Sequence, residues 1–471
     1  MKAEEIAIIQ SKRNAAIVAP AGHGKTEMIV DLVEAAKGKV LLVTHTNAGV
    51  YALTKRLKKR GVNSTRYSIT TIAGFSLRWC MAYPKTGSIR HIATTDKDYY
   101  PMLYDGAISI FKNTWARDVL RRSYNTIIVD EYQDCILPQH QIFVEINKTV
   151  RVIVLGDPLQ AIFGWAGKLV SWRTLGFERI EIETYPWRWE HTNPLLGKYL
   201  NDIRKSLLPG LDGQRIRLEL KDVVGCIQVM PSSCKQDYSL INSIRNYDNA
   251  VYITRWKPDQ EAFSRTTGGI FQNDEAQAIN NLFETAIDFD KRIGHISTKR
   301  LFEFLESCAT GISSELRSYQ RNIQKGNYEF KRIKSYPEFG KLINTVNENP
   351  NNDNIIAVID WLIKNKNFKI YRKELLFEMR RALIYSKNND ISISDAAQRI
   401  RMIPGLQKEY PKFRMLSSRT VLSKGLEFDC VIIDLEKGIS VTDFYVALTR
   451  AKKQVILISD RTTIFLDVPK L

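Results

Sequence analysis

The chain has 471 residues, which exceeds one typical hydrophobic core and predicts two to four domains. Hydrophobic residues make up 44% and charged residues 25% of the sequence, as in soluble globular proteins. Its 69 lysines and arginines outnumber 51 aspartates and glutamates, which gives a formal net charge of +18. An excess of this size favours a polyanionic partner such as nucleic acid, although a merely basic surface would leave the same composition.

The cysteine and histidine patterns and the hydropathy argue against several classes of protein. The six cysteines include no close CxxC pair, which argues against a structural zinc site or an iron–sulfur cluster and fits thiols in a reducing cytoplasm. None of the six histidines has HExxH spacing, which argues against a metalloprotease. The N-terminus lacks the design of a signal peptide, and no apolar run approaches about 18 residues. We therefore expect a cytoplasmic protein that makes no contact with a membrane.

Short apolar runs rich in β-branched residues alternate with stretches of helical spacing in the first part of the chain. The runs occupy residues 15–18, 40–43, 126–129 and 152–155. This alternation predicts a parallel sheet with helical crossovers. We assign residues 1–80 and 113–185 to this first core, and residues 81–112 to a small insertion that interrupts it.

Similar runs return at 251–253, 431–433 and 455–458. They predict a second α/β core over residues 186–257 and 405–471. Residues 258–404 differ, because apolar residues recur there with the period of a helix. The helical stretches are 301–308, 355–364, 374–385 and 393–401. The expected fold class is α/β, with two cores, a small insertion in the first and a helical insertion in the second.

Residues 19–26, Ala-Pro-Ala-Gly-His-Gly-Lys-Thr, follow the first predicted strand and open a predicted helix. This is the setting of a P-loop, in which glycines let backbone N–H groups turn inward and cradle phosphates at a helix N-terminus. Lys25 is expected to pair with the β- and γ-phosphates, and Thr26 to bind Mg²⁺. The expected nucleotide-binding residues of the loop are Ala21, Gly22, His23, Gly24, Lys25 and Thr26.

An acidic pair, Asp130 and Glu131, follows the predicted strand at 126–129. Carboxylates in this position downstream of a P-loop are typical of enzymes that hydrolyse ATP with Mg²⁺. Asp130 is expected to hold Mg²⁺ through its water shell, and Glu131 to orient and deprotonate the attacking water. A solvated acidic turn is the alternative, but at a strand end both carboxylates would face the phosphates.

Seven segments, in order along the chain, resemble motifs of the UvrD/Rep branch of superfamily 1 DNA helicases. They are APAGHGKT at 19–26, THTNA at 44–48, TIAGF at 71–75, DEYQD at 130–134, GDPLQAIFGWAG at 156–167, KGLEFD at 424–429 and YVALTRAK at 445–452. The resemblance spans nearly the whole chain and implies two RecA-like P-loop cores. It also implies an ATP-dependent translocase and helicase that moves 3′ to 5′ on single-stranded DNA, with a role in DNA repair or antiphage defence.

The resemblance assigns roles around the nucleotide residue by residue. Gln160 would sense the γ-phosphate. Arg188 and Arg450 would reach the γ-phosphate as arginine fingers, which stabilise the charge of the transition state. Trp187 stands where the family has tyrosine, and its ring can still stack on the nucleotide base.

Contacts with the nucleic-acid strand are implied in the same way. The expected contact residues are Thr44, Asn47, Phe75, Phe163 and Trp165. Aromatic faces bind unpaired bases at about 1–3 kcal/mol each, and the small residues around Phe163 and Trp165 favour an open loop over core packing. Gly425 and Glu427 would link the nucleotide to the strand-binding loop.

Two positions near the P-loop depart from the family pattern. The glutamine that normally precedes the loop is not evident, because Gln10 lies too close to it. Glu27 stands where the family often has arginine after the Gly-Lys-Thr triplet. Half of the usual clamp on adenine is therefore missing, and we expect weak selection among nucleotide bases.

The chain is short for this family, and it also resembles the helicase-like subunit of Gabija-type antiphage systems. That resemblance implies a nuclease partner, such as an OLD-family nuclease, and a 3′-tailed or end-containing duplex as substrate. An alternative function is therefore open: an ATPase switch that senses DNA ends and regulates a partner nuclease with little unwinding of its own. A fused helicase–nuclease is a third hypothesis, but its acidic segment, 434–437, directly follows a predicted strand and fits a loop better.

Overall fold

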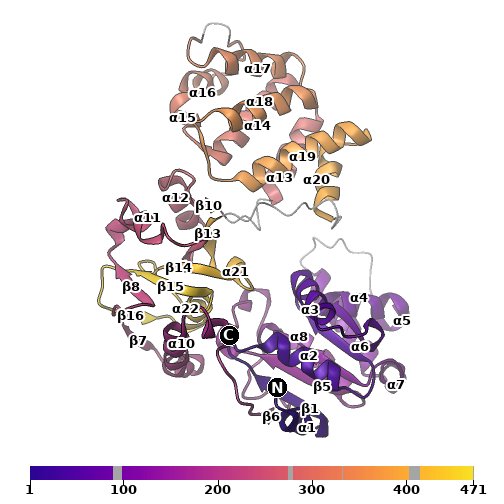
Figure 1. The fold of residues 1–471 in the computed structure, drawn as a ribbon. Coiled ribbons are helices and arrows are strands. Elements are labelled where there is room, and N and C mark those ends of the chain that lie inside the picture. Colours follow the sequence, from indigo (N-terminus) through magenta and orange to yellow (C-terminus); the bar gives the residue numbers. More distant parts are fainter. Residues whose placement is uncertain (89–97, 274–278, 331–332, 403–413, 470–471) are drawn as a thin grey trace. The chain divides into compact units, whose positions relative to one another are not determined.

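The computed structural model describes residues 1–88, 98–273, 279–330, 333–402 and 414–469 (Figure 1). The chain divides into two compact units. The first comprises Met1–Cys226, Gly438–Lys453 and Thr463–Leu471, and the second comprises Ile227–Lys437 and Gln454–Thr462. Within the described ranges, no helix has the length and apolar character needed to cross a membrane.

The first unit contains a six-stranded parallel sheet in the order β3-β2-β4-β5-β1-β6. Its strands are β1 (Asn14–Val18), β2 (Val40–Thr44), β3 (Tyr67–Thr71), β4 (Thr126–Val129), β5 (Arg151–Gly156) and β6 (Arg179–Ile180). Every residue of β2 and β4 is buried, as expected for parallel strands covered on both faces. The four predicted strands of this part are confirmed as β1, β2, β4 and β5.

Eight helices connect or flank these strands. They are α1 (Ala3–Ser11), α2 (Lys25–Ala35), α3 (Asn47–Lys59), α4 (Ile72–Ala82), α5 (Pro84–Gly87), α6 (Tyr99–Phe111), α7 (Thr114–Ser123) and α8 (Leu137–Asn147). Two threonine side chains cap α3 and α4 by accepting a backbone N–H of the first turn: Thr46 from Gly49 and Thr71 from Gly74, both at 3.0 Å. Thr46 stands two residues after β2 and Thr71 is the last residue of β3, so the motif segments at 44–48 and 71–75 are strand-to-helix turns.

Helix α6 lies in the region predicted as a small insertion. Its side chains Leu103, Ala107 and Phe111 are buried in the same hydrophobic cluster as Val43 of β2 and Ile127 of β4. This packing makes α6 a helix of the first core. The predicted bounds of the insertion, 81–112, stay a prediction, and the contacts show that α6 within them packs on the sheet.

The second unit contains the other six-stranded sheet, in the order β10-β13-β9-β14-β15-β8. Its strands are β8 (Ile227–Met230), β9 (Ala250–Thr254), β10 (Gln272–Asn273), β13 (Met415–Arg419), β14 (Phe428–Asp434) and β15 (Ala451–Ile458). Helices α11 (Ser239–Ile244), α12 (Lys257–Thr266) and α21 (Thr420–Ser423) accompany them. The three predicted strands are confirmed as β9, β14 and β15, and so is the α/β fold class with two parallel-sheet cores.

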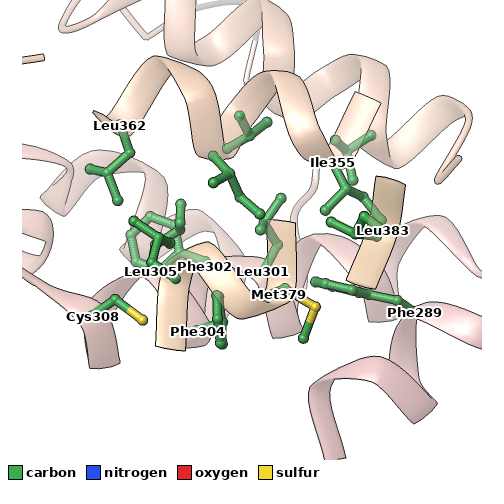
Figure 2. Close-up of a cluster of buried hydrophobic side chains, with 14 of the residues drawn as sticks. Phe289, Leu301, Phe302, Phe304, Leu305, Cys308, Ile355, Leu362, Met379 and Leu383 are labelled. Carbon is green, nitrogen blue, oxygen red and sulfur yellow. The ribbon is translucent and has the colours of Figure 1, made fainter. Parts of the chain in front are cut away.

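A helical lobe follows β10 in the second unit, as predicted. Its helices are α13 (Ile279–Asp290), α14 (Gly294–Cys308), α15 (Ile312–Glu315), α16 (Arg317–Gln324), α17 (Pro337–Glu348), α18 (Asn352–Lys364), α19 (Lys373–Asn389) and α20 (Ile393–Met402), with a short ladder of β11 (Ala309–Thr310) and β12 (Lys369–Ile370). Figure 2 shows Leu305 of α14, Ile355 of α18 and Leu383 of α19 among the side chains of a continuous apolar core. The lobe thus has its own hydrophobic core.

The division into units differs from the boundary predicted near residue 186. Helices α9 (Trp187–Glu190), α10 (Pro194–Leu207) and α22 (Val441–Leu448), with the ladder of β7 (Ile216–Glu219) and β16 (Thr463–Leu466), fall in the first unit. Within this unit, side-chain bonds join α10 and α22 to the loop after β5. Those bonds form part of the candidate site.

Candidate active site

The P-loop runs from the end of β1 to the start of α2. Gly22 and Gly24 have φ angles of +73° and +80°, a region that favours glycine. A Cβ atom on Gly22 would lie 2.6 Å from Cζ3 of Trp189, so a larger residue would not fit. Gly24 is the N-cap of α2, and Lys25 and Thr26 form the first turn. The loop therefore ends at a helix N-terminus whose first turn carries Lys25 and Thr26, as phosphate binding requires.

The acidic pair Asp130 and Glu131 lies beside the P-loop lysine. Lys25 Nζ is 3.6 Å from Asp130 Oδ1 and 2.5 Å from Glu131 Oε1. Burial opposes the charge of Lys25, but the two carboxylates outweigh it and raise the lysine pKa. Burial also raises the pKa of Asp130 to about 6, although Lys25 acts against this shift. The predicted catalytic lysine and both carboxylates are thus brought together.

Glu131 has a backbone conformation that is rare for a residue with a side chain. Its φ angle is +55°, in the left-handed region. The side-chain Nε2 of Gln133 donates to the Glu131 carboxylate, and the side-chain Oε1 of Gln133 accepts the Asp157 N–H at 3.1 Å. Such strained backbone persists only where the surroundings fix it, and it is frequent at functional sites. Gln133 therefore orients the residue expected to activate water.

Asp157, after β5, connects the P-loop with Gln160, the predicted γ-phosphate sensor. Its fully buried carboxylate accepts the Ala21 N–H at 3.2 Å, Gln160 Nε2 at 3.2 Å and Arg204 Nη2 at 2.7 Å. Gln160 Oε1 in turn accepts Arg450 Nη2 at 3.3 Å. The predicted γ-phosphate sensor and one predicted arginine finger are therefore in direct contact.

The second predicted arginine, Arg188, also lies at the P-loop. Its backbone N–H donates to the carbonyl of Gly22 at 3.1 Å, and its guanidinium donates to the carbonyl of Thr449. The neighbouring Trp187 side chain is 58% exposed. Its Cδ1 lies 3.1 Å from the position that a Cβ on Gly24 would take. An exposed aromatic ring beside the phosphate loop can stack on a nucleotide base.

The two departures from the family pattern both have structural partners. Glu27 forms ion pairs with Arg56 of α3 and with Arg60, the C-cap residue of α3. The pair with Arg60 has a distance of 2.9 Å. The side-chain amide of Gln10 donates to the carbonyl of Ala35 at 2.7 Å. These bonds stabilise the contacts of α2 with α3 and α1. Neither side chain is poised to read a base.

The residues expected to contact a strand differ in exposure. Thr44 is 2% exposed at the end of β2, and Phe163 is half-buried. Phe75 is 3% exposed and its ring stacks on a phenylalanine of α6, so its expected contact with a base stays a prediction. The side chains of Asn47 and Trp165 lie outside the described part of the structure, and their contacts stay predictions.

Gly425 and Glu427 lie between α21 and β14 in the second unit. Gly425 has a φ angle of +86° with open space around its Cα, and Glu427 is exposed. Their expected link to the nucleotide stays a prediction.

Sequence reasoning missed three polar residues of the site. Asp157 and Tyr445 stand inside segments that resemble helicase motifs, where an aspartate at a strand end was an available signal. Arg204 lies on α10 outside every such segment, so only the folded chain shows its ion pair with Asp157.

These residues fit a nucleoside triphosphate with Mg²⁺. The glycine turn and the start of α2 suit the phosphates, while Thr26 and Asp130 supply the hydroxyl and carboxylate oxygens that Mg²⁺ prefers. Both arginines and Gln160 add donors for γ-phosphate oxygens.

Comparisons with known proteins agree with this geometry. Residues 3–165 match the family model described as an AAA domain. Gabija protein GajB of Bacillus cereus (strain VD045) is 26% identical over 199 residues, a match that covers 34% of this chain and 40% of GajB. The expected resemblance to a Gabija-system protein is confirmed by this match. The matched part spans less than half of GajB.

Two solved structures of Arterivirus nonstructural protein 10 (helicase), one in complex with DNA, also align with the chain. The alignment covers 98% of this chain and 63% or 62% of theirs, at 11% and 10% identity, with a TM-score of 0.36 in both cases.

Proposed function

We propose that the chain is an ATP-dependent translocase and helicase that moves 3′ to 5′ on single-stranded DNA. The observation that carries the proposal is the bond between Gln160 and Arg450, beside the cluster of Lys25, Asp130 and Glu131. It joins the helicase-like segments at 156–167 and 445–452 to one phosphate site. The direction of movement rests on the resemblance alone.

The residues divide the work of hydrolysis. Lys25 would exchange its carboxylate partners for β- and γ-phosphate oxygens. Thr26 and Asp130 would hold Mg²⁺, which would neutralise developing phosphate charge. Glu131 then orients a water and accepts its proton. Arg188 and Arg450 stabilise the charge of the transition state.

We further propose a role in antiphage defence with a nuclease partner, and the name of the Gabija relative supports this role. The assignment of that nuclease to the OLD family rests on the resemblance alone. In that setting the substrate is a 3′-tailed or end-containing duplex. The alternative function, an ATPase switch that senses DNA ends, uses the same site but barely unwinds.

Strand displacement distinguishes these functions. The measurement is unwinding of a 3′-tailed duplex with ATP by the wild-type chain and by Lys25→Ala, with a 5′-tailed duplex as the polarity control. A 3′-to-5′ helicase unwinds only the first substrate, and only with Lys25. DNA-stimulated ATP hydrolysis without unwinding of either substrate would instead favour the switch.

A further inference from the structure

Helix α10 carries none of the helicase-like segments, yet two of its side chains reach the nucleotide loops. Arg204 Nη2 donates to Asp157 Oδ1 at 2.7 Å, and Asn201 Oδ1 lies 3.0 Å from His23 Nε2. The first contact is on the loop after β5, and the second is on the P-loop. Positions three apart share one helix face, so a single face of α10 holds both loops.

The pair of Arg204 and Asp157 is buried. The Asp157 side chain is fully buried, and that of Arg204 is 12% exposed. Burial opposes the charge of Arg204, but attraction to Asp157 outweighs it and raises the arginine pKa. A buried carboxylate needs such a partner, because burying an unpaired charge is costly. The pair is therefore kept at a cost that a purely structural contact between α10 and the loop after β5 would avoid.

Tyr445 of α22 completes the surroundings of this carboxylate. Its hydroxyl hydrogen-bonds to Asp157, and the Arg204 guanidinium lies 5.8 Å from the centre of its ring. Burial raises the pKa of Tyr445, so the hydroxyl keeps its proton and donates it to the hydrogen bond. Asp157 is thus held from two helices.

Asp157 in turn fixes the positions of the P-loop backbone and of Gln160. The carboxylate accepts the Ala21 N–H of the P-loop and the Gln160 amide, and Gln160 contacts Arg450. A displaced Asp157 would release the P-loop backbone and the γ-phosphate sensor together.

We propose that Arg204 is a positioning residue for nucleotide hydrolysis, which acts by fixing Asp157 between the P-loop and Gln160. This inference rests on the proposed ATPase function. Arg204 touches no expected position of the nucleotide, so its loss affects the alignment of the transition state more than nucleotide binding.

The test compares Arg204→Met and Arg204→Lys with Lys205→Met. Lys205 is the matched control because it is an exposed cation at the next position of α10. The measurements are kcat and KM for ATP with saturating single-stranded DNA, the Kd of a non-hydrolysable ATP analogue and the midpoint of thermal unfolding.

We expect Arg204→Met to lower kcat about a hundredfold, the loss typical of a small misplacement of catalytic groups. KM and Kd should change less than about threefold. Arg204→Lys should recover part of kcat, and Lys205→Met should match the wild type.

A folded Arg204→Met chain with wild-type kcat would overturn the inference. So would an equal loss of kcat and analogue affinity, which indicates a structural role. If Arg204→Met alone does not fold, the double variant with Asp157→Asn removes both buried charges and should bind the analogue but hydrolyse slowly; wild-type kcat in that variant would also overturn the inference. A wild-type chain that hydrolyses no nucleotide would refute the proposed function itself.

Discussion

Asp130, Glu131 and Lys25 place three ionisable groups within a few ångströms at the end of β4. Because burial raises the pKa of Asp130 to about 6, this carboxyl takes up a proton in a pH range where most aspartates stay ionised. A protonated Asp130 cannot hold Mg²⁺. We therefore predict that kcat/KM for MgATP falls as the pH drops through about 6, since kcat/KM reports the free enzyme. The corresponding decline in kcat should lie at lower pH, because bound Mg²⁺ favours the carboxylate.

The control for this pH profile is stability. The pKa of Asp130 in the folded chain lies above its ordinary value of 3.8, so the folded state binds this proton more tightly than the unfolded state. This group therefore favours folding as the pH falls toward 4, and its contribution is lost as the pH rises through about 6. The chain should stay folded while activity declines. A kcat/KM that is constant down to about pH 5 would contradict the prediction.

Base recognition is also decided by single residues. The carboxylate of Glu27 is held by two arginines, Gln10 is bonded to Ala35, and Trp187 offers a stacking face without an edge-specific bond. We predict that GTP and CTP support hydrolysis within about tenfold of ATP, because discrimination needs hydrogen bonds to the base.

The measurement is kcat/KM for four nucleotides with saturating single-stranded DNA. As a control, Trp187→Ala should weaken the use of all four by similar factors, since stacking does not distinguish their edges. A preference for ATP beyond about a hundredfold would show that another group reads adenine.

The helical lobe of α13–α20 should be stabilised by its own hydrophobic core. Leu305 of α14 is fully buried there (Figure 2), whereas Ile287 of α13 is 52% exposed. We predict that Leu305→Ala lowers the free energy of unfolding of the lobe by about 2–5 kcal/mol, through lost burial and a cavity. The matched variant Ile287→Ala should change it by less than about 0.5 kcal/mol. Urea unfolding followed by the fluorescence of Trp361 in the lobe measures both, and equal effects would contradict an independent core.

The elements that the sequence could predict are those whose burial leaves a pattern in the residues. Strands β2 and β4 are buried on both faces and therefore read as continuous apolar runs. The position of helix α6 is harder to predict from the sequence. It depends on contacts with residues more than fifty positions away, such as those of β2. The P-loop and the acidic pair could be found from local order along the chain. Arg204 could not, because its partner Asp157 is 47 positions away and α10 has no motif.

Phe75 shows that a motif in the sequence does not by itself tell which of its side chains is exposed. The segment at 71–75 resembles a strand-contacting motif, but in this chain it begins α4, and its phenylalanine turns into the core. A motif locates a turn between elements. Which side chain faces solvent there depends on packing that the motif does not encode.

At the scale of the whole molecule, the expected site gathers groups from segments far apart in the sequence, from Lys25 to Arg450. A chain with a net charge of +18 is expected to attract a phosphate backbone, and helicase-like residues are expected on both cores. A bound strand should therefore favour the arrangement in which hydrolysis occurs.

The most direct test of this account is the ATP turnover of the wild-type chain with and without single-stranded DNA, beside folded Lys25→Ala and Glu131→Gln variants. The account predicts that DNA raises wild-type turnover at least about tenfold. Lys25→Ala should be inactive, and Glu131→Gln should bind MgATP without hydrolysing it, because the amide accepts no proton from water. Equal wild-type turnover with and without DNA or RNA, or normal turnover by Lys25→Ala, would contradict the account.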